Sequence, residues 1–586
     1  MNLPPNLNYQ VLVKQAKRLA PDSGTPLRLA LLADVSTQHL VPILRVLFAR
    51  SLISVAIYEA GFDTIQAEVY DPASALYSFE AQVVVILQSV SGLRARYYHH
   101  QGDVSDFVES EVEACSRLWE TLQSRLPVPV IQSTFVLPYE RPYGNFGVKV
   151  PDTLLSATAA INRELCMKVR SFPSVFINDL DYLAGWVGRR EFFDEKLWAL
   201  AKSICALDCL PLVAKNIVDI ALAGIGRGVK CVVVDLDNTL WGGVVGDDGL
   251  EGIGLGDLDE GGAFHALQCY LRDLWRRGVL LAVCSKNDDA IARRVFAEHP
   301  AMVLKEEHIA MFVANWEDKA SNIARIRETL NIGYDAMVFL DDNPFERNLV
   351  RQMIPEIVVP ELPEDPALYV RALAELNLFE TTSASGLDAQ RTAMYQHQAQ
   401  REQERSKVGN LEDYLRSLQT TVLFSRFEPQ NLGRIAQLIQ RSNQFNLTTR
   451  RYSETQCEAL MRDEAGCFPF SLTVQDRFGD FGLVNVVVLR KAGKVLEIDL
   501  FLMSCRVLQR GVEQFAMNKI FDYAQRFGFE RVEGRYIPTA KNVMVKDFFE
   551  KFGFARTADA PDGSVWTLAT SRYAPSTVFV AEKSTS

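Results

Sequence analysis

Short apolar runs alternate with longer amphipathic stretches along residues 1–225 of the chain. The runs at 27–32, 83–87, 128–131 and 175–177 are rich in Val, Leu and Ile and predict core strands. Residues 103–126, between two of these runs, have the spacing of an amphipathic helix. Strands and helices that alternate in this way predict a parallel sheet with helices on both faces.

Three further apolar runs lie between residues 226 and 370. Residues 231–234, 280–284 and 336–340 are continuously hydrophobic, as in buried parallel strands, whose carboxyl ends bind ligands in open α/β sheets. A short apolar segment at 357–359, followed by Pro360, predicts a last strand. The residues after the first three runs are Asp235 and Asp237, then Ser285, Lys286 and Asn287, and finally Asp341, Asp342, Asn343 and Pro344.

The last third of the chain has a different pattern. Residues 380–410 are rich in Gln, Arg and Glu, which predicts a loop and a solvated linking helix. Three helices are predicted beyond them: one at 432–442, one that opens within 504–511 and continues to 527, and one that ends within 548–554. Three strands are also predicted, at 481–489, 495–503 and 531–534, and a hairpin turn joins the first two. Residues 571–586 predict a flexible tail.

Length and composition predict a multidomain α/β protein. A chain of 586 residues is too long for a single core and predicts roughly three or four domains. The domains expected are 1–225, 226–370 and 411–570, with a linker at 371–410 and a tail at 571–586.

Charge and cysteine usage narrow the class of protein. The net charge of -11 argues against sequence-independent binding to nucleic acid or to an anionic membrane. No run approaches the ~20 apolar residues of a membrane span, and the opening residues lack the order of a signal peptide. The 10 cysteines are scattered without a zinc-binding spacing, which predicts reduced thiols in the cytoplasm.

The acid pairs at the strand ends indicate a divalent metal. Asp235 and Asp237 repel each other unless a cation lies between them, and Mg²⁺ prefers such oxygen ligands. A carboxylate beside Mg²⁺ is also a competent nucleophile toward a phosphate, because the metal neutralises the repelling charge. The alternative is an Asp-x-Asp sequence that only caps a helix after a core strand.

The order of these motifs resembles that of the haloacid-dehalogenase (HAD) superfamily: a strand-terminal acid pair, a strand-terminal hydroxyl, Lys319 near the start of a helix, and a second acid pair. The resemblance implies a Rossmann-like parallel-sheet domain at 226–370. It also implies that the glycine-rich residues 242–249 form a flap over the metal site. An ordinary surface β-hairpin is the alternative for that segment.

The N-terminal residues resemble the SGNH hydrolases, with Ala33-Asp34-Val35-Ser36 where those enzymes carry their nucleophile turn. No His occurs between His100 and His265, so the late Asp-x-x-His element of that family is absent. A serine hydrolase needs a His base. We therefore expect an SGNH-like α/β domain that serves interaction or scaffolding, with an active esterase as the alternative.

Residues 411–570 resemble the GNAT acyltransferases, an α+β fold, in their strand, basic turn and helix. In that family, backbone N–H groups at a helix N-terminus hold the pyrophosphate of CoA. Gln509 replaces a glycine of the GNAT pattern, and its Cβ would crowd a phosphate near the backbone. A carrier-bound phosphopantetheine, with a single phosphate, is easier to accommodate.

Together these stretches resemble the FkbH-like family of HAD proteins, of the subfamily IIIC type, over essentially the whole chain. The family implies that 1,3-bisphosphoglycerate loses phosphate and that its glyceryl unit is loaded onto the phosphopantetheine thiol of an acyl carrier protein, for polyketide or related biosynthesis. The matching stretches are residues 234–244, 284–287, 339–347, 442–450 and 503–506.

The resemblance also implies roles for individual residues. Asp235 attacks the phosphoryl group, and Asp237 protonates the leaving oxygen and then activates water. Ser285 and Lys319 hold the phosphoryl oxygens. The implied Mg²⁺ ligands are Asp235, the backbone carbonyl of Asp237, Asp342 and, as a second candidate, Asp341. The substrate-binding candidates are Thr239, Asn287, Asn443, Gln444, Asn446, Arg450 and Arg506.

Three routes are open for acyl transfer. Cys505 lies at a strand end beside Arg506, a setting that lowers a thiol pKa, and Cys284 is its rival next to Ser285. Either thiol has the alternative of being buried and inert, and direct attack by the pantetheine thiol needs no Cys. The polar residues at 443–450 also have an alternative, a turn whose Asn and Thr side chains bond to the local backbone.

Three functions remain from these patterns. The first is a glyceryl transferase and phosphatase that acts on a carrier protein. The second is a plain Mg²⁺-dependent phosphatase of small metabolites or phosphoproteins. The third is a non-catalytic scaffold that docks carrier proteins, which the intact acid pairs, Ser285 and Lys319 disfavour.

Overall fold

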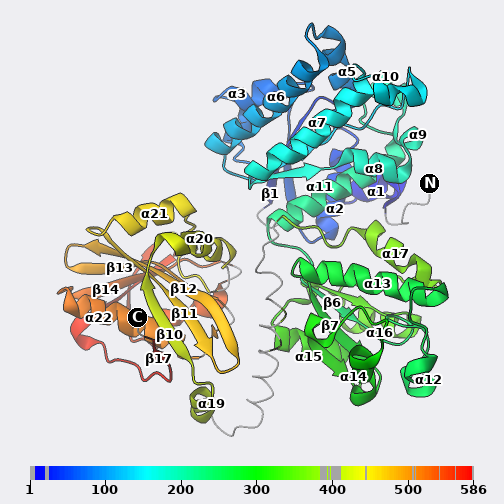
Figure 1. The fold of residues 1–586 in the computed structure, drawn as a ribbon. Helices are drawn as coiled ribbons and strands as arrows, with labels where there is room; N and C mark the ends of the chain where they lie inside the picture. Colours follow the sequence, from blue (N-terminus) through cyan, green and yellow to red (C-terminus); the bar gives the residue numbers. More distant parts are fainter. Residues whose placement is uncertain are drawn as a thin grey trace. The chain divides into compact units, whose positions relative to one another are not determined.

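The computed structural model describes residues 7–19, 26–382, 392, 396, 411–442, 445–504, 507–508, 510–539, 542–560 and 563–583. It contains three β-sheets (Figure 1). The chain divides into two compact units. One comprises Met1–Val279, Glu298–Leu304 and Ile332–Asp388, and the other comprises Leu280–Ala297, Lys305–Asn331 and Ala389–Ser586. Apart from Thr392 and Gln396, the linking helix predicted within 383–410 lies outside the described residues.

The first unit contains a five-stranded sheet in the order β2-β1-β3-β4-β5. All four neighbouring pairs are parallel, as the alternation of strands and helices predicts. The edge strand β2 was missing from the prediction, although residues 55–58 form a short apolar run; its residues are partly exposed because β2 has a neighbour on one side only. The strands are β1 (Leu27–Ala33), β2 (Val55–Glu59), β3 (Val83–Leu87), β4 (Val130–Ser133) and β5 (Val175–Asn178).

Helices cover both faces of this sheet (Figure 1). Alternate residues of β1 point to opposite sides: Leu29 and Leu31 belong to one hydrophobic core, and Ala30 and Leu32 to the other. The first core contains α1 (Tyr9–Ala16), α2 (Val41–Arg50), α8 (Leu180–Val187) and α11 (Leu210–Gly224). The second contains α3 (Ile65–Tyr70), α6 (Val104–Arg125) and α7 (Leu154–Lys168).

Asp34 follows β1 directly and is buried at the carboxyl end of the sheet. Its Oδ1 accepts a hydrogen bond from the Ser89 backbone N–H at 2.8 Å. Burial raises the pKa of Asp34 from its ordinary 3.8 to about 7, although the Ser89 bond and the charge of Arg96 act in the opposite direction. Between these two pH values the folded protein holds a proton that the unfolded chain releases.

We therefore expect the first unit to lose stability as the pH rises from about 4 to about 7. The loss is up to about 4 kcal/mol, because each pKa unit corresponds to about 1.4 kcal/mol. Asp34→Asn removes the titration, so its urea midpoint at pH 8 should exceed that of the wild type, whereas the two should agree more closely at pH 4. Asp152→Asn, at an exposed carboxyl, is the matched control. An equal pH dependence in Asp34→Asn and wild type would contradict the prediction.

A second sheet has the strand order β8-β7-β6-β9. Within the first unit, β6 (Cys231–Val234) and β9 (Met337–Leu340) are parallel. The strand predicted at 357–359 is wrong: Val358 forms only an isolated bridge with Val338. Pro360 lacks an N–H group, so the pairing cannot extend beyond it. The helices of this part are α12 (Val245–Gly252), α13 (Asp259–Arg276), α16 (Pro344–Met353) and α17 (Tyr369–Leu376).

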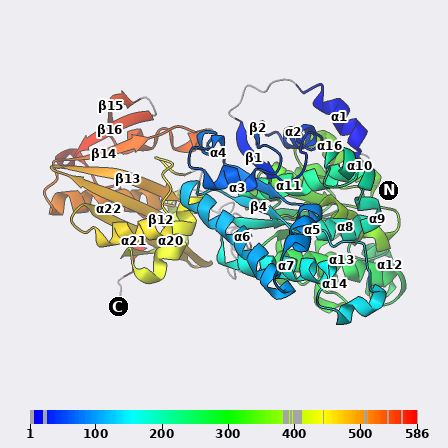
Figure 2. The same ribbon diagram turned by 90° about the horizontal axis from the view of Figure 1, so that it is seen from above.

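The second unit contains the parallel pair β7 (Leu280–Ser285) and β8 (Ile309–Ala314), with α14 (Asp289–Glu298) and α15 (Lys319–Leu330). It also contains an eight-stranded mixed sheet in the order β15-β16-β14-β13-β12-β11-β10-β17. Figure 2 shows the part of this sheet from β15 to β12. The strands are β10 (Thr421–Arg426), β11 (Cys467–Asp476), β12 (Gly479–Ala492), β13 (Val495–Met503), β14 (Arg531–Tyr536), β15 (Ala555–Ala560), β16 (Gly563–Ala569) and β17 (Ala581–Glu582).

The mixed sheet also has helices on both faces. One core includes α22 (Val512–Arg526) and the other includes α20 (Leu432–Arg441) and α21 (Glu454–Arg462). The predicted helix at 432–442 and the hairpin at 490–494 are confirmed by α20 and by the antiparallel pair β12–β13. Strands β10 and β11, which the prediction lacked, pair with each other and with β12.

Strands β13 and β14 run parallel for only four residue pairs, from Val495–Arg531 to Ile498–Gly534, and then separate. Residues 445–447 lie between them. The Leu447 N–H donates to the Phe501 carbonyl at 3.1 Å, and the Leu447 carbonyl accepts from the Ile537 N–H at 2.9 Å. This segment therefore satisfies backbone groups that the separated strands cannot offer each other.

The C-terminal residues are held against the mixed sheet, so the prediction of a flexible tail is wrong for the described part of 571–586. Strand β17 pairs with β10, and the Tyr573 ring stacks on Phe521 at 3.9 Å between ring centroids. Asn518 Oδ1 accepts from the Tyr573 hydroxyl at 2.6 Å. Val578 and Val580 of this segment also pack against the core of the mixed sheet, so side-chain burial and strand pairing both hold it in place.

None of the helices in the described ranges combines the length and the hydropathy that a membrane span requires.

Candidate active site

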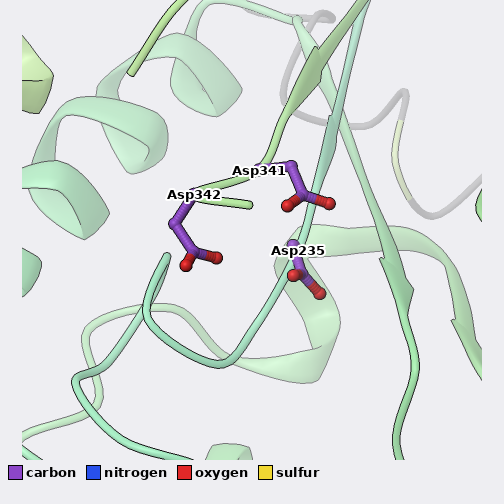
Figure 3. Close-up of side chains that lie close together, drawn as sticks. All are labelled: Asp235, Asp341 and Asp342. Atoms are coloured by element: carbon purple, nitrogen blue, oxygen red, sulfur yellow. The ribbon is translucent and has the colours of Figure 1, made fainter. Parts of the chain in front are cut away.

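Three carboxylates meet at the carboxyl ends of β6 and β9. Val234 and Leu340 are register partners in this parallel pair, and the Asp235 N–H donates to the Leu340 carbonyl at 2.9 Å. The residues that follow each strand are therefore neighbours. Carboxylate oxygens of Asp235, Asp341 and Asp342 all lie within 4.8 Å of one another (Figure 3). Asp235 and Asp341 are buried, and Asp342 is partly buried.

This donor set fits a hard divalent cation. Three carboxylates so close together, two of them buried, repel one another strongly unless positive charge lies among them. Oxygen ligands alone, without Cys or His, suit Mg²⁺ and disfavour zinc. Three protein ligands are enough for a Mg²⁺ site, because Mg²⁺ usually retains several waters at its other coordination positions.

The loop after β6 is tied to the acidic cluster. Thr239 Oγ1 donates to Asp342 Oδ1 at 3.3 Å and accepts from the Asp342 N–H at 3.2 Å. Asn238 has a φ of +54°, which turns the loop sharply. The Tyr369 hydroxyl of α17 donates to the Asn238 carbonyl at 3.2 Å. Burial, with the charge of Asp342 second, raises the pKa of Tyr369 to about 12, so this phenol keeps its proton.

One carboxylate oxygen of Asp237 is hydrogen-bonded to donors that follow it in the chain. Its Oδ1 accepts from the Trp241 indole N–H at 2.8 Å and from the Val245 backbone N–H at 3.1 Å. The Asp237 carboxylate is not part of the three-carboxylate group, although the sequence named Asp237 among the metal ligands through its backbone carbonyl. Trp241 is fully buried. The two donors fix the orientation of a carboxyl group that lies two residues after Asp235.

Trp241→Phe is expected to lower kcat for a phosphate ester about tenfold while KM stays nearly constant, because it removes one of two donors that orient Asp237. The loss should be larger for an alkyl phosphate than for p-nitrophenyl phosphate, since a good leaving group needs little general acid. A uniform loss across leaving groups, in parallel with a lower melting temperature, would assign Trp241 to packing alone.

Arg347, in α16, supports the second acid pair. Its guanidinium donates to the backbone carbonyl of Asp341 at 2.8 Å and to that of Asp342 at 2.6 Å, and it pairs with Glu361 at 2.9 Å. The side chain is buried, with only 5% exposed. Sequence reasoning gave no role to Arg347, Trp241 or Tyr369. Arg347 and Trp241 lie inside the sequence motifs, so the sequence could have indicated them. No motif near Tyr369 in the sequence indicates its role.

The glycine-rich segment is not a simple hairpin. Gly242 and Gly254 pair as an antiparallel bridge, and the residues between them include the helix α12. The role of a flap over the metal site stays a prediction. A Cβ on Gly242 would lie 2.9 Å from the Phe264 ring, so any side chain at this position would have to displace that ring.

In the second unit, Ser285 ends β7 and Lys319 begins α15. Both side chains are buried, with 2% and 3% exposed, and Asn287 is buried as well. The Cys284 thiol donates to the Lys319 carbonyl at 3.7 Å, so the end of β7 lies beside the start of α15. A buried ammonium is stable only near opposite charge or good acceptors.

The polar candidates of the last domain are placed in part. Asn446 is buried and lies opposite Leu502 in an antiparallel bridge, and its Oδ1 accepts from the Thr449 N–H at 2.9 Å. Arg450 pairs with the buried Asp499 at 2.7 Å, as does Arg490 at 3.1 Å. Asn443, Gln444, Cys505, Arg506 and Gln509 lie outside the described residues.

Comparison with known proteins identifies the class. A family model described as the FkbH N-terminal domain matches residues 28–222. The crystal structure of an N-terminal part of the Bacteroides fragilis protein BF1531, which contains a phosphatase domain and was complexed with Mg, is 38% identical. The match covers 64% of this chain and 99% of that one, with a TM-score of 0.60.

Two acetyltransferase structures match a smaller part of the chain. The ribosomal-protein-S18-alanine N-acetyltransferase of Escherichia coli is 14% identical over 26% of this chain and 94% of that one, with a TM-score of 0.21. The spermidine N-acetyltransferase of Vibrio cholerae, in complex with CoA and spermine, is 17% identical over 26% of this chain and 98% of that one, with a TM-score of 0.21. A search of curated proteins gives no match.

The parallel sheet with acid pairs at its strand ends and the similarity to a phosphatase domain define a protein of the HAD superfamily. The chain belongs to the FkbH-like family of HAD proteins.

Proposed function

We propose that this protein is a Mg²⁺-dependent phosphatase of the HAD type. The observation that carries the proposal is the group of Asp235, Asp341 and Asp342, whose oxygens lie within 4.8 Å of one another at the ends of adjacent parallel strands. The related Bacteroides fragilis domain, crystallised with Mg, supports the choice of metal. The ligands would be the three carboxylates, with the Asp237 backbone carbonyl as a further candidate.

In this proposal, a carboxylate oxygen of Asp235 attacks the phosphorus atom of the substrate. The bond from phosphorus to the leaving oxygen breaks, and Asp237 gives its proton to that oxygen. Asp237 then takes a proton from water, which attacks the aspartyl-phosphate and releases phosphate. Bound Mg²⁺ supplies charge neutralisation between the carboxylates and the phosphoryl oxygens. Ser285 and Lys319 donate to those oxygens.

The finer proposal is that the substrate is 1,3-bisphosphoglycerate and that the glyceryl unit is loaded onto a phosphopantetheinylated acyl carrier protein. The carrier thiol, or a Cys thiol before it, attacks the acyl carbon; phosphate leaves with the electrons of the C–O bond, and the thiol proton goes to solvent. The phosphoryl group on the C3 oxygen passes to Asp235 as its P–O bond breaks and Asp237 protonates that oxygen, and water then releases it as phosphate. This assignment rests on the resemblance to the FkbH-like family.

One feature of the mixed sheet supports an acyl-transfer role. Asp499 lies at a β-bulge, where it holds Arg450 and Arg490 with side chains 47% and 40% exposed. Bulges of this kind often re-aim side chains near binding sites, and two half-exposed arginines suit the phosphate of a carrier arm.

Cys505 is the favoured thiol in this proposal. Cys284 is fully buried and its thiol donates to a backbone carbonyl, which supports a structural role for it. The nine described cysteines are free thiols, which supports a reducing compartment such as the cytoplasm. Mass spectrometry after incubation with the acyl phosphate separates the routes: an adduct lost in Cys505→Ala and kept in Cys284→Ala assigns Cys505, and no adduct in the wild type assigns direct transfer.

The decisive experiment offers 1,3-bisphosphoglycerate to the enzyme with holo carrier protein, with apo carrier protein, and with neither. Loading requires a mass gain of one glyceryl unit on the holo carrier alone, together with phosphate release. If phosphate is released and no carrier gains mass, the protein is a plain phosphatase of small phosphometabolites. If phosphate is not released and no carrier gains mass, but the carrier still binds, the protein is a docking scaffold.

A further inference from the structure

The five-stranded sheet of the first unit has a pocket at the carboxyl ends of β3, β4 and β5. Residues 88–91 directly follow β3, Val136 follows β4, and Leu180 follows β5. The carboxyl ends of the strands are the edge at which open α/β sheets bind ligands.

The inner surface of this pocket is apolar. Val90, Val136, Leu180 and Ile204 line it and are each at least nine-tenths buried. The hydroxyl groups beside them serve the protein itself: Ser89 Oγ accepts from the Gly92 N–H at 3.1 Å, and Ser203 Oγ donates to the Cys205 carbonyl at 2.8 Å. A ligand at this depth therefore contributes a hydrocarbon group rather than a charge.

The outer part of the pocket is aromatic and polar. Tyr139 and Phe193 pack edge to face at 5.5 Å between centroids, and Trp198 completes this wall. Gln88 Oε1 accepts from Gln132 at 2.9 Å, which orients the Gln88 amide N–H groups. These groups suit hydroxyl, carbonyl or amide groups on a ligand.

The charges around the opening disfavour an anion. Arg94 is paired with Glu140 at 2.7 Å, and Lys202 stacks over the Trp198 ring at 5.1 Å. Asp194 and Glu195 add two carboxylates to the lining, and Asp194 caps α10 (Glu195–Ala201) through the Leu197 N–H. The acids near the opening thus outnumber the bases, so a phosphate or carboxylate would meet net repulsion.

We propose that this pocket binds an uncharged aliphatic molecule whose chain carries hydroxyl or amide groups. The inference goes beyond the phosphatase proposal and does not depend on it, because every lining residue lies between Gln88 and Ile204. It gives the N-terminal sheet a ligand-binding role of its own, separate from the carboxylates at β6 and β9.

Pantetheine is a suitable probe, because it joins a branched aliphatic group, hydroxyls and amides without a charge. Titration calorimetry with the full-length protein should show saturable binding of one equivalent. Ser91→Phe, which fills the opening, and Trp198→Ala, which removes the wall, should each weaken binding at least tenfold, whereas Ser91→Ala should leave it nearly unchanged. Pantothenate, which ends in a carboxylate, should bind more weakly than pantetheine.

All three variants should retain the circular dichroism spectrum and the phosphatase rate of the wild type, which separates failure of this inference from failure of the phosphatase proposal. No binding of pantetheine to the wild type would overturn the inference. Equal binding by Ser91→Phe, Trp198→Ala and wild type would overturn the location, and equal binding of pantothenate would overturn the assignment to an uncharged ligand.

Discussion

Asp235→Asn should lower the rate of phosphate release by on the order of 10⁴-fold or more, because the amide keeps the shape of the side chain but cannot attack phosphorus. The carboxylate is buried at the end of β6 and shares its surroundings with Asp341 and Asp342. Steady-state release of phosphate from an acyl phosphate or phosphate ester measures the effect. The same protein should accumulate no covalent phosphoryl adduct, whereas Asp237→Asn should accumulate one when hydrolysis of the adduct is slowed.

Asp247→Asn provides the matched control, since it makes the same chemical change at an exposed carboxyl in α12. Its rate should equal that of the wild type. If Asp235→Asn released phosphate at the wild-type rate, the role of Asp235 as nucleophile would be excluded, and the mixed sheet would become the place to look for the chemistry.

Asp342→Asn should weaken the affinity for Mg²⁺ by on the order of 100-fold, because one of three ligand charges is lost. An Asn Oδ1 still accepts from Thr239, whose hydroxyl lies 3.3 Å from the present Asp342 Oδ1, so the loop after β6 keeps its support. The Mg²⁺ dependence of phosphate release and calorimetric titration with Mg²⁺ both report the change. High Mg²⁺ should restore part of the activity.

The same variant should have the opposite effect on the metal-free protein. In the presence of EDTA the three carboxylates repel one another, so removal of one charge should raise the melting temperature, while the rise produced by Mg²⁺ should shrink. Asp335→Asn, an exposed carboxyl before β9, should change neither quantity. A wild-type Mg²⁺ affinity in Asp342→Asn would remove Asp342 from the metal site.

The amino-acid sequence by itself determined the pieces of this protein that depend on short-range pattern. The apolar runs before Asp235 and Asp341 predict buried strands, because the burial of apolar side chains is favourable whatever the tertiary arrangement. The alternating strands and helices of residues 1–225 likewise predict a parallel sheet covered on both faces, and the carboxylates at strand ends predict a divalent metal.

Only the tertiary structure decided which of these groups meet. Asp237 follows Asp235 by two residues, yet its carboxylate turns to Trp241, whereas Asp342 joins Asp235 because β6 and β9 are neighbours. Tyr369 supports the loop at Asn238 across 131 residues of sequence, and the C-terminal segment pairs with β10 through β17. Hydrogen bonds and charge contacts of this kind depend on distances set by packing between remote segments, and no local pattern of residues encodes those distances.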